Sequence, residues 1–141
     1  MTCIAWKDGI IAVDRQCSRG NIKFEDNKLH VWCGQVITWA GAADYGQALL
    51  HWYQMGADPE RFPAFQREKD FVQFVVASHG VVKIYYQTPH PCTQYGPFGA
   101  LGSGGEFAAG AMAWGASAEE AVMLASKHCD GVGFGVDSRK Y

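Results

Sequence analysis

The strongest constraint on the fold stands at the amino-terminal end, where Asp8-Gly9 joins two short apolar runs. The first run reads TCIAWK and the second IIAVD. Because an Asp-Gly pair readily adopts the positive φ angles of a tight turn, these residues predict a β-hairpin. Its first strand begins at Thr2 and its second ends at Asp14. A strand that starts at the second residue, with no tail before it, leads us to expect that the amino terminus itself has a function.

The rest of the sequence alternates between groups of strands and groups of helices. Further strands are predicted from β-rich runs within residues 28–33, 35–40, 71–88 (a hairpin turning at His79-Gly80), 98–105 and 131–141. Helices are predicted over residues 44–56 and 106–114, and after a capping box that begins at Ser117. Residues 16–26 are interpreted as a loop or short edge strand, 57–70 as a connector with at most a short helix, and 89–99 as a loop. This order predicts one layered α+β domain over residues 1–141, with antiparallel sheets.

Composition excludes several classes of function. A hydrophobic content of 48% with 18% charged residues predicts a packed core and excludes disorder. The net charge of −2 and the lack of a basic stripe argue against nucleic-acid binding, and no apolar run is long enough to span a membrane. The low share of charged residues favours a homo-oligomer that buries part of its apolar surface.

The cysteines and histidines give no metal signature. The five cysteines are scattered without a C-x-x-C pair, which predicts reduced, mostly buried thiols in a cytoplasmic protein. The five histidines form no H-x-x-x-H or similar pair. We therefore expect no metal and no cofactor.

The Met-Thr start is compatible with chemistry at the amino terminus. Methionine is normally removed when the next residue is small, which would leave Thr2 with a free α-amine. The pKa of such an amine is about 7.7–8.0, so a useful fraction is neutral near pH 7 and can accept the hydroxyl proton. A nearby lysine lowers that pKa further, a buried carboxylate orients the lysine, and backbone N–H groups stabilise the oxyanion.

Taken in order, five segments resemble the proteasome β-subunit/HslV family of N-terminal threonine peptidases, in its compact phage or bacterial form. The segments are TCIAWKDGIIAVDRQCSRGN, NKLHV, VITWAGAAD, ALGSGGEFAAGAM and the Asp130-Gly-Val-Gly stretch. The resemblance covers nearly the whole chain. It implies the four-layer αββα sandwich of the Ntn hydrolases, with two antiparallel sheets. The second helix of that fold would be shortened or missing here, because residues 57–70 contain only a two-proline connector.

The resemblance also implies the catalytic residues. Thr2 matches the nucleophile, and Asp14 matches the aspartate that orients a lysine. Lys28 precedes the strand pair at nearly the family's spacing and is the preferred lysine, with Lys23 as the competing candidate. Gly41 matches the glycine whose N–H completes the oxyanion hole.

Further positions follow from the same resemblance. Ser103 matches the serine near the terminal amine, and Asp130 the aspartate that supports it. The family's second serine, three residues after this aspartate, is Gly133 here, which leaves thinner support around Ser103. Cys17 and Trp39 match positions that line the substrate pocket, where Trp39 would favour small or medium side chains. For Trp39, a simple core role remains an equal alternative.

These features lead us to expect a threonine-type endopeptidase that acts through Thr2 once Met1 is removed. Its substrates would be peptides or unfolded proteins, and an unfoldase ATPase is a candidate partner, although the sequence shows no docking motif for one. Two alternatives stay open: an inactive structural subunit of a proteasome-like assembly, and a hydrolase of small amides with the same fold. Cys3 as nucleophile would need a second trimming step.

Overall fold

The computed structural model describes residues 1–65 and 70–141. The predicted amino-terminal hairpin forms the centre of a four-stranded antiparallel sheet, in the order β10-β1-β2-β11. Its strands are β1 (Cys3–Lys7), β2 (Ile10–Asp14), β10 (Phe98–Gly102) and β11 (Val136–Lys140). Asp8 and Gly9 have φ angles of 52° and 74°, as the tight turn between β1 and β2 requires.

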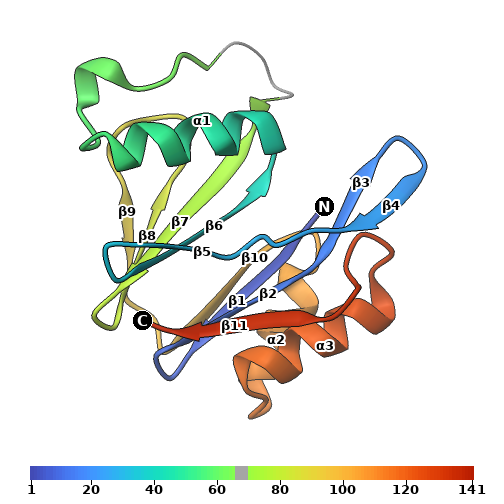
Figure 1. Ribbon diagram of the computed structural model, residues 1–141. Coiled ribbons are helices and arrows are strands. Elements are labelled where there is room, and N and C mark those ends of the chain that lie inside the picture. Colours follow the sequence, from blue (N-terminus) through green and yellow to red (C-terminus); the bar gives the residue numbers. More distant parts are fainter. Residues whose placement is uncertain (66–69) are drawn as a thin grey trace.

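A five-stranded antiparallel sheet faces the first one, in the order β5-β6-β7-β8-β9. Its strands are β5 (His30–Trp32), β6 (Gln35–Gly41), β7 (Val72–Ser78), β8 (Val81–Tyr85) and β9 (Cys92–Gln94). A separate two-stranded hairpin consists of β3 (Gln16–Arg19) and β4 (Ile22–Glu25). It projects from the side of the molecule in Figure 1.

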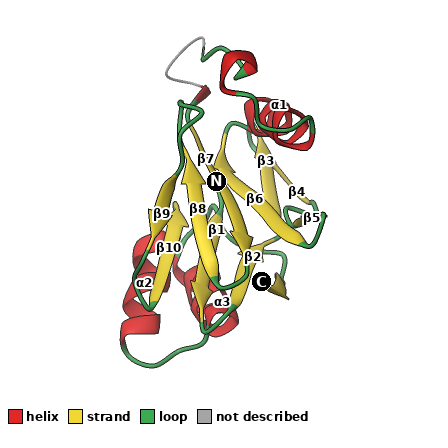
Figure 2. Ribbon diagram, turned by 90° about the vertical axis from the view of Figure 1, so that its left-hand side faces the viewer, coloured by secondary structure: helices red, strands yellow, loops and turns green. Residues whose placement is uncertain are grey.

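The helices lie on the outer faces of the two larger sheets. Figures 1 and 2 show α1 (Ala43–Gln54) beside the five-stranded sheet, and α2 (Gly105–Ala113) with α3 (Ala118–His128) at the opposite end of the molecule, beside the four-stranded sheet. A short 3₁₀ helix, η1 (Pro59–Arg61), follows α1. The capping box of α3 is confirmed, because the Ser117 hydroxyl accepts a hydrogen bond from Glu120 N and the Glu120 carboxylate accepts one from Ser117 N.

Three hydrophobic clusters hold these elements together. One lies between the sheets and joins Ile4, Val13, Val75 and Ile84. A second joins the four-stranded sheet to α2 and α3 through small residues such as Ala121, whose size lets the helices approach closely. The third joins α1 to the five-stranded sheet. The nucleophile candidate therefore lies at the end of a strand that is packed on both faces.

The expected α+β fold with antiparallel sheets is confirmed, with two corrections. The sheets number three among the described residues, because residues 16–25 form the β3–β4 hairpin instead of a loop or single edge strand. The expected loop over 89–99 contains β9, which pairs with β8. The expectation of a connector with at most a short helix agrees with its described part, where the short 3₁₀ helix η1 lies, and residues 66–69 of that prediction lie outside the described residues.

Candidate active site

The amino-terminal hairpin brings Thr2 and Asp14 to the same end of the four-stranded sheet. The pairing of Ile4 with Val13 places Cys3 level with Asp14, one residue beyond Thr2. Cys3 N donates a hydrogen bond of 2.9 Å to Asp14 Oδ1. The strand register alone therefore places the hydroxyl and the carboxylate side by side.

Lys28 completes this cluster from the segment between β4 and β5. Its Nζ lies 3.0 Å from Thr2 Oγ1 and 3.0 Å from Asp14 Oδ1. A third hydrogen bond, of 3.1 Å, goes to the carbonyl oxygen of Met1. These three acceptors use all three N–H donors of the ammonium group. Lys23, the competing candidate, lies instead beside Asp130 in a different pocket.

Asp14 is fully buried, and backbone donors surround its carboxylate. Oδ1 accepts from Cys3 N and from Lys28, while Oδ2 accepts from Gln16 N at 3.1 Å and from Gly133 N at 3.2 Å. A buried carboxylate is tolerated only when it is paired and hydrogen-bonded in this way. The geometry thus holds Asp14 as the fixed support of Lys28.

Gly41 ends β6 and lines a pocket of about 660 Å³ together with Thr2 and Lys28. Its φ of +116° is a backbone conformation that other residues rarely adopt. A Cβ atom there would also lie 2.2 Å from the carbonyl oxygen of Phe71. Glycine is therefore required for the backbone to turn at this edge of the pocket.

Ser103 and Asp130 are placed differently relative to Thr2. The Ser103 hydroxyl donates a hydrogen bond of 3.3 Å to the carbonyl oxygen of Thr2. Asp130 takes part through its backbone, whose carbonyl accepts a 2.7 Å hydrogen bond from Gln16 Nε2. Within residues 1–65 and 70–141, no hydrogen bond joins Asp130 to Ser103, so the structure brings only the serine to the terminal strand.

Cys17 and Trp39 line the same pocket as Thr2. The Trp39 ring stacks on His30, with 5.0 Å between ring centroids, and on the buried Phe74 at 6.1 Å. Trp39 therefore forms part of the pocket wall and also packs on the core, so it combines the pocket role and the core role that the sequence left as alternatives. Burial lowers the pKa of His30, which favours the neutral ring near pH 7.

Sequence reasoning missed Gln16, a buried side chain with 5% exposure that contacts the candidate site. It lies two residues after Asp14, within a stretch that looks polar and irregular. Its partners lie in the turn after α3, far away in the chain, so no local pattern indicates them. Gly133, noted only as a missing serine, proves to donate its N–H to Asp14.

All five cysteines are free, but only Cys3 is buried, so the expectation of mostly buried thiols is wrong. Cys33 lies in the β5–β6 turn with a φ of 49°, and Cys92 lies on edge strand β9; both are exposed. Burial, with Asp14 as the next cause, raises the pKa of the Cys3 thiol to about 12. Such a thiol stays protonated in the physiological range and is a poor nucleophile.

Alkylation tests this difference between the cysteines. With iodoacetamide at pH 8 on the folded protein, we expect Cys33 and Cys92 to be modified and Cys3 to stay unmodified, because only the thiolate reacts. Peptide mass spectrometry distinguishes the sites. Modification of Cys3 as fast as that of Cys92 would contradict this assignment, and a denatured sample serves as the control in which every cysteine reacts.

Two kinds of feature are absent from the described part of the chain. No group of three or more His, Cys, Asp or Glu residues within it is arranged to hold a metal ion. None of its helices is both long and apolar enough to cross a membrane.

Comparison with known proteins supports the fold. No protein-family model and no curated protein sequence matches the chain. Among solved structures, eukaryotic HslV from Trypanosoma brucei is similar over 100% of both chains, with 18% identity and a TM-score of 0.73. A Thiobacillus denitrificans protein named BPH is similar over 98% of this chain and 95% of its own, with 21% identity and a TM-score of 0.71. The same protein in complex with epoxomicin gives 21% identity, coverage of 98% and 96%, and a TM-score of 0.70. The predicted resemblance is thereby confirmed at the level of the fold, and the chain has the fold of HslV.

Proposed function

We propose that this protein is an N-terminal threonine peptidase that acts through Thr2 after removal of Met1. One observation carries the proposal: Lys28 Nζ lies 3.0 Å from both Thr2 Oγ1 and the buried Asp14 carboxylate. A hydroxyl, an ammonium group and a carboxylate in this order match the needs of a terminal threonine nucleophile. Epoxomicin bound to a protein of the same fold adds support.

In the proposed reaction, Thr2 Oγ1 attacks the carbonyl carbon of a peptide bond, and its proton passes to the α-amine of Thr2. The Lys28 ammonium beside that amine favours the neutral, proton-accepting form. The Gly41 N–H would stabilise the oxyanion of the tetrahedral intermediate. The amine then gives its proton to the leaving nitrogen, an ester forms on Thr2, and water hydrolyses it. No cofactor or metal takes part.

Ser103 and Asp130 belong to the proposal in supporting roles. The Ser103 hydroxyl is held on the carbonyl of Thr2 and so lies near the terminal amine, where it can help proton transfer. Asp130 stabilises the turn that follows α3 through its backbone carbonyl. Cys17 and Trp39 would contact the substrate side chain next to the scissile bond, and the stacked Trp39 ring favours small or medium side chains there.

The arrangement of layers and the assembly are also proposals. With α1 on one outer face and α2 and α3 on the other, we assign the chain to the four-layer αββα sandwich, as a single domain over residues 1–141. We propose a cytoplasmic homo-oligomer, because large apolar side chains such as Phe107, Trp114 and Met123 are exposed on and after the outer helices. Peptides or unfolded proteins are the proposed substrates, with an unfoldase ATPase as a candidate partner.

Epoxomicin labelling tests the function directly. We expect protein whose first residue is shown by mass spectrometry to be Thr2 to gain the mass of one inhibitor per chain. Thr2→Ala removes the nucleophile and should give no adduct, while Thr2→Ser keeps a hydroxyl and should retain labelling. An absence of labelling in confirmed Thr2-terminal protein would overturn the proposal.

Substrate assays and the oligomeric state, measured beside epoxomicin labelling, separate the two alternatives. An inactive structural subunit would form oligomers but would neither take up epoxomicin nor cleave peptides. A small-amide hydrolase would turn over small amides in a Thr2-dependent way and would leave unfolded proteins intact.

A further inference from the structure

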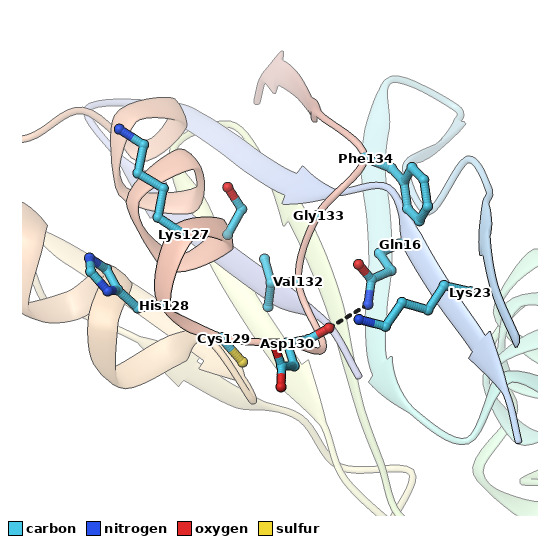
Figure 3. A pocket seen from close by; sticks show the side chains of 10 residues that line it. Gln16, Lys23, Lys127, His128, Cys129, Asp130, Val132, Gly133 and Phe134 are labelled. Atoms are coloured by element: carbon cyan, nitrogen blue, oxygen red, sulfur yellow. Dashed lines mark hydrogen bonds between the residues drawn. The ribbon is translucent and has the colours of Figure 1, made fainter. Parts of the chain in front are cut away.

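The Gln16 side chain joins the start of β3 to the turn at residues 130–133, which follows α3. Its Nε2 donates a hydrogen bond of 2.7 Å to the carbonyl of Asp130, as Figure 3 shows. Nearby, Arg15 N donates to the carbonyl of Gly133 at 3.0 Å. Both ends of the turn are therefore tied to the residues that immediately follow β2.

The fit between Gln16 and Gly133 is close. A Cβ atom at position 133 would lie 2.7 Å from Gln16 Oε1, so the carboxamide end of the Gln16 side chain would have to shift to admit it. Position 133 also matches the position of the second serine in the family that the sequence resembles. The Gln16 carboxamide occupies the space that such a side chain would need, so the glycine is the counterpart of Gln16.

This turn contacts the catalytic cluster through one hydrogen bond. Gly133 N donates to Asp14 Oδ2 at 3.2 Å, and Asp14 Oδ1 binds Lys28, which in turn contacts Thr2. A shift of the turn would remove one of the donors that fix the buried carboxylate. Gln16 itself contacts neither Thr2 Oγ1 nor Lys28 Nζ by hydrogen bond in the described part of the chain.

We propose that the Gln16 side chain is a positioning residue of the threonine site: it holds the 130–133 turn where Gly133 N–H can donate to Asp14. The inference rests on the proposed function. It also gives Gly133 a role. Because the glycine has no side chain, it leaves room for the Gln16 side chain, which in turn holds the Gly133 N–H in place. The main-chain N–H of Gln16, which also donates to Asp14, is not affected by changes to the side chain.

The first test measures inactivation by epoxomicin in Thr2-terminal Gln16→Ala. We expect the maximal inactivation rate, kinact, to fall about tenfold, the effect of one lost hydrogen bond to a charged group, with KI changed less than about twofold. Gln35→Ala, which removes a glutamine from β6 outside this site, is the matched control and should leave both unchanged. A purely structural loss of folded protein would lower the labelled fraction but not kinact. An unchanged kinact in Gln16→Ala would overturn the inference.

A double-mutant cycle tests the coupling. Gly133→Ser should lower kinact, because its Cβ displaces Gln16. In the Gln16→Ala background, Gly133→Ser should lower kinact less, because the space beside position 133 is then vacant. The effects of the two changes on kinact would therefore be non-additive. Full additivity would count against the proposed fit.

An activity-independent measurement separates this inference from the proposed function. Amide hydrogen exchange of Gly133 should be at least about tenfold faster in Gln16→Ala than in the wild type or in Gln35→Ala. If the wild type is not labelled by epoxomicin, the peptidase proposal fails, and the exchange rate still decides whether Gln16 holds the turn. Equal exchange in all three proteins would overturn the positioning role even if the enzyme is active.

Discussion

Replacing Lys28 with methionine is expected to destabilise the protein by about 3–5 kcal/mol and to abolish labelling by epoxomicin. The side chain of Lys28 is 8% exposed and that of Asp14 is 0% exposed, so the change leaves a buried carboxylate without its cation. Breaking a buried ion pair by removing one partner typically costs this much, because the remaining charge is uncompensated. Urea-induced unfolding, followed by circular dichroism, measures the free energy of unfolding.

The matched control is Lys83→Met, which changes an exposed lysine on β8 and should alter stability by less than about 0.5 kcal/mol. A double-mutant cycle identifies the cause. The Lys28→Met change should cost less in an Asp14→Asn background than in the wild type, because no carboxylate charge is then left unpaired. If Lys28→Met alone is as stable as the wild type, Asp14 is not held as a buried anion.

The parts of the fold that were predicted correctly have strong local signals. The turns at Asp8-Gly9 and His79-Gly80 each adopt two positive φ angles, as their sequences indicated. The capping box at Ser117 marks the beginning of α3 for the same reason, because its hydrogen bonds join residues only three positions apart. Such features can be read from a single sequence.

The elements that were missed depend on distant partners. Strand β9 is three residues long, lies in a segment with three prolines, and forms because β8 offers it an edge. Every residue of β4 is exposed, so it lacks the alternation of buried and exposed positions that predicts a strand. In β4 and β9, hydrogen bonding to a neighbouring strand outweighs the conformational preference of the local sequence.

The candidate site likewise contains residues that the sequence indicated and contacts that it did not. Thr2, Asp14 and Lys28 were named from the chemistry that they can perform and from a family resemblance, and the structure places them within hydrogen-bond distance. The contacts of Gln16 were not foreseen, because they join β3 to a turn more than a hundred positions later. In the sequence, Gly133 indicates only that a serine hydroxyl is missing. In the structure, its backbone N–H donates a hydrogen bond to Asp14.

A chain that keeps Met1 is expected to react with epoxomicin at least about a hundredfold more slowly than the same chain beginning at Thr2, the usual effect of losing a general base. With Met1 attached, the nitrogen of Thr2 is part of a peptide bond and has no basic lone pair. The Thr2 hydroxyl also donates to the Met1 carbonyl at 2.7 Å, and that carbonyl accepts the third N–H of Lys28. The cluster is therefore assembled before processing but lacks its base.

Cell-free synthesis without methionine aminopeptidase provides the Met1 form, and synthesis with the enzyme provides the Thr2 form. Because Thr2 is only 6% exposed and the Met1 carbonyl accepts two hydrogen bonds, the enzyme is added during synthesis, before the chain folds. Labelling should then rise in parallel with the fraction of Thr2-terminal chains in the intact mass spectrum, whereas Thr2→Ala should stay unlabelled with and without the enzyme. Equal labelling of both forms of the wild type would mean that a side chain, not the terminal amine, accepts the proton, and the mechanism would have to be reassigned to a base such as Lys28.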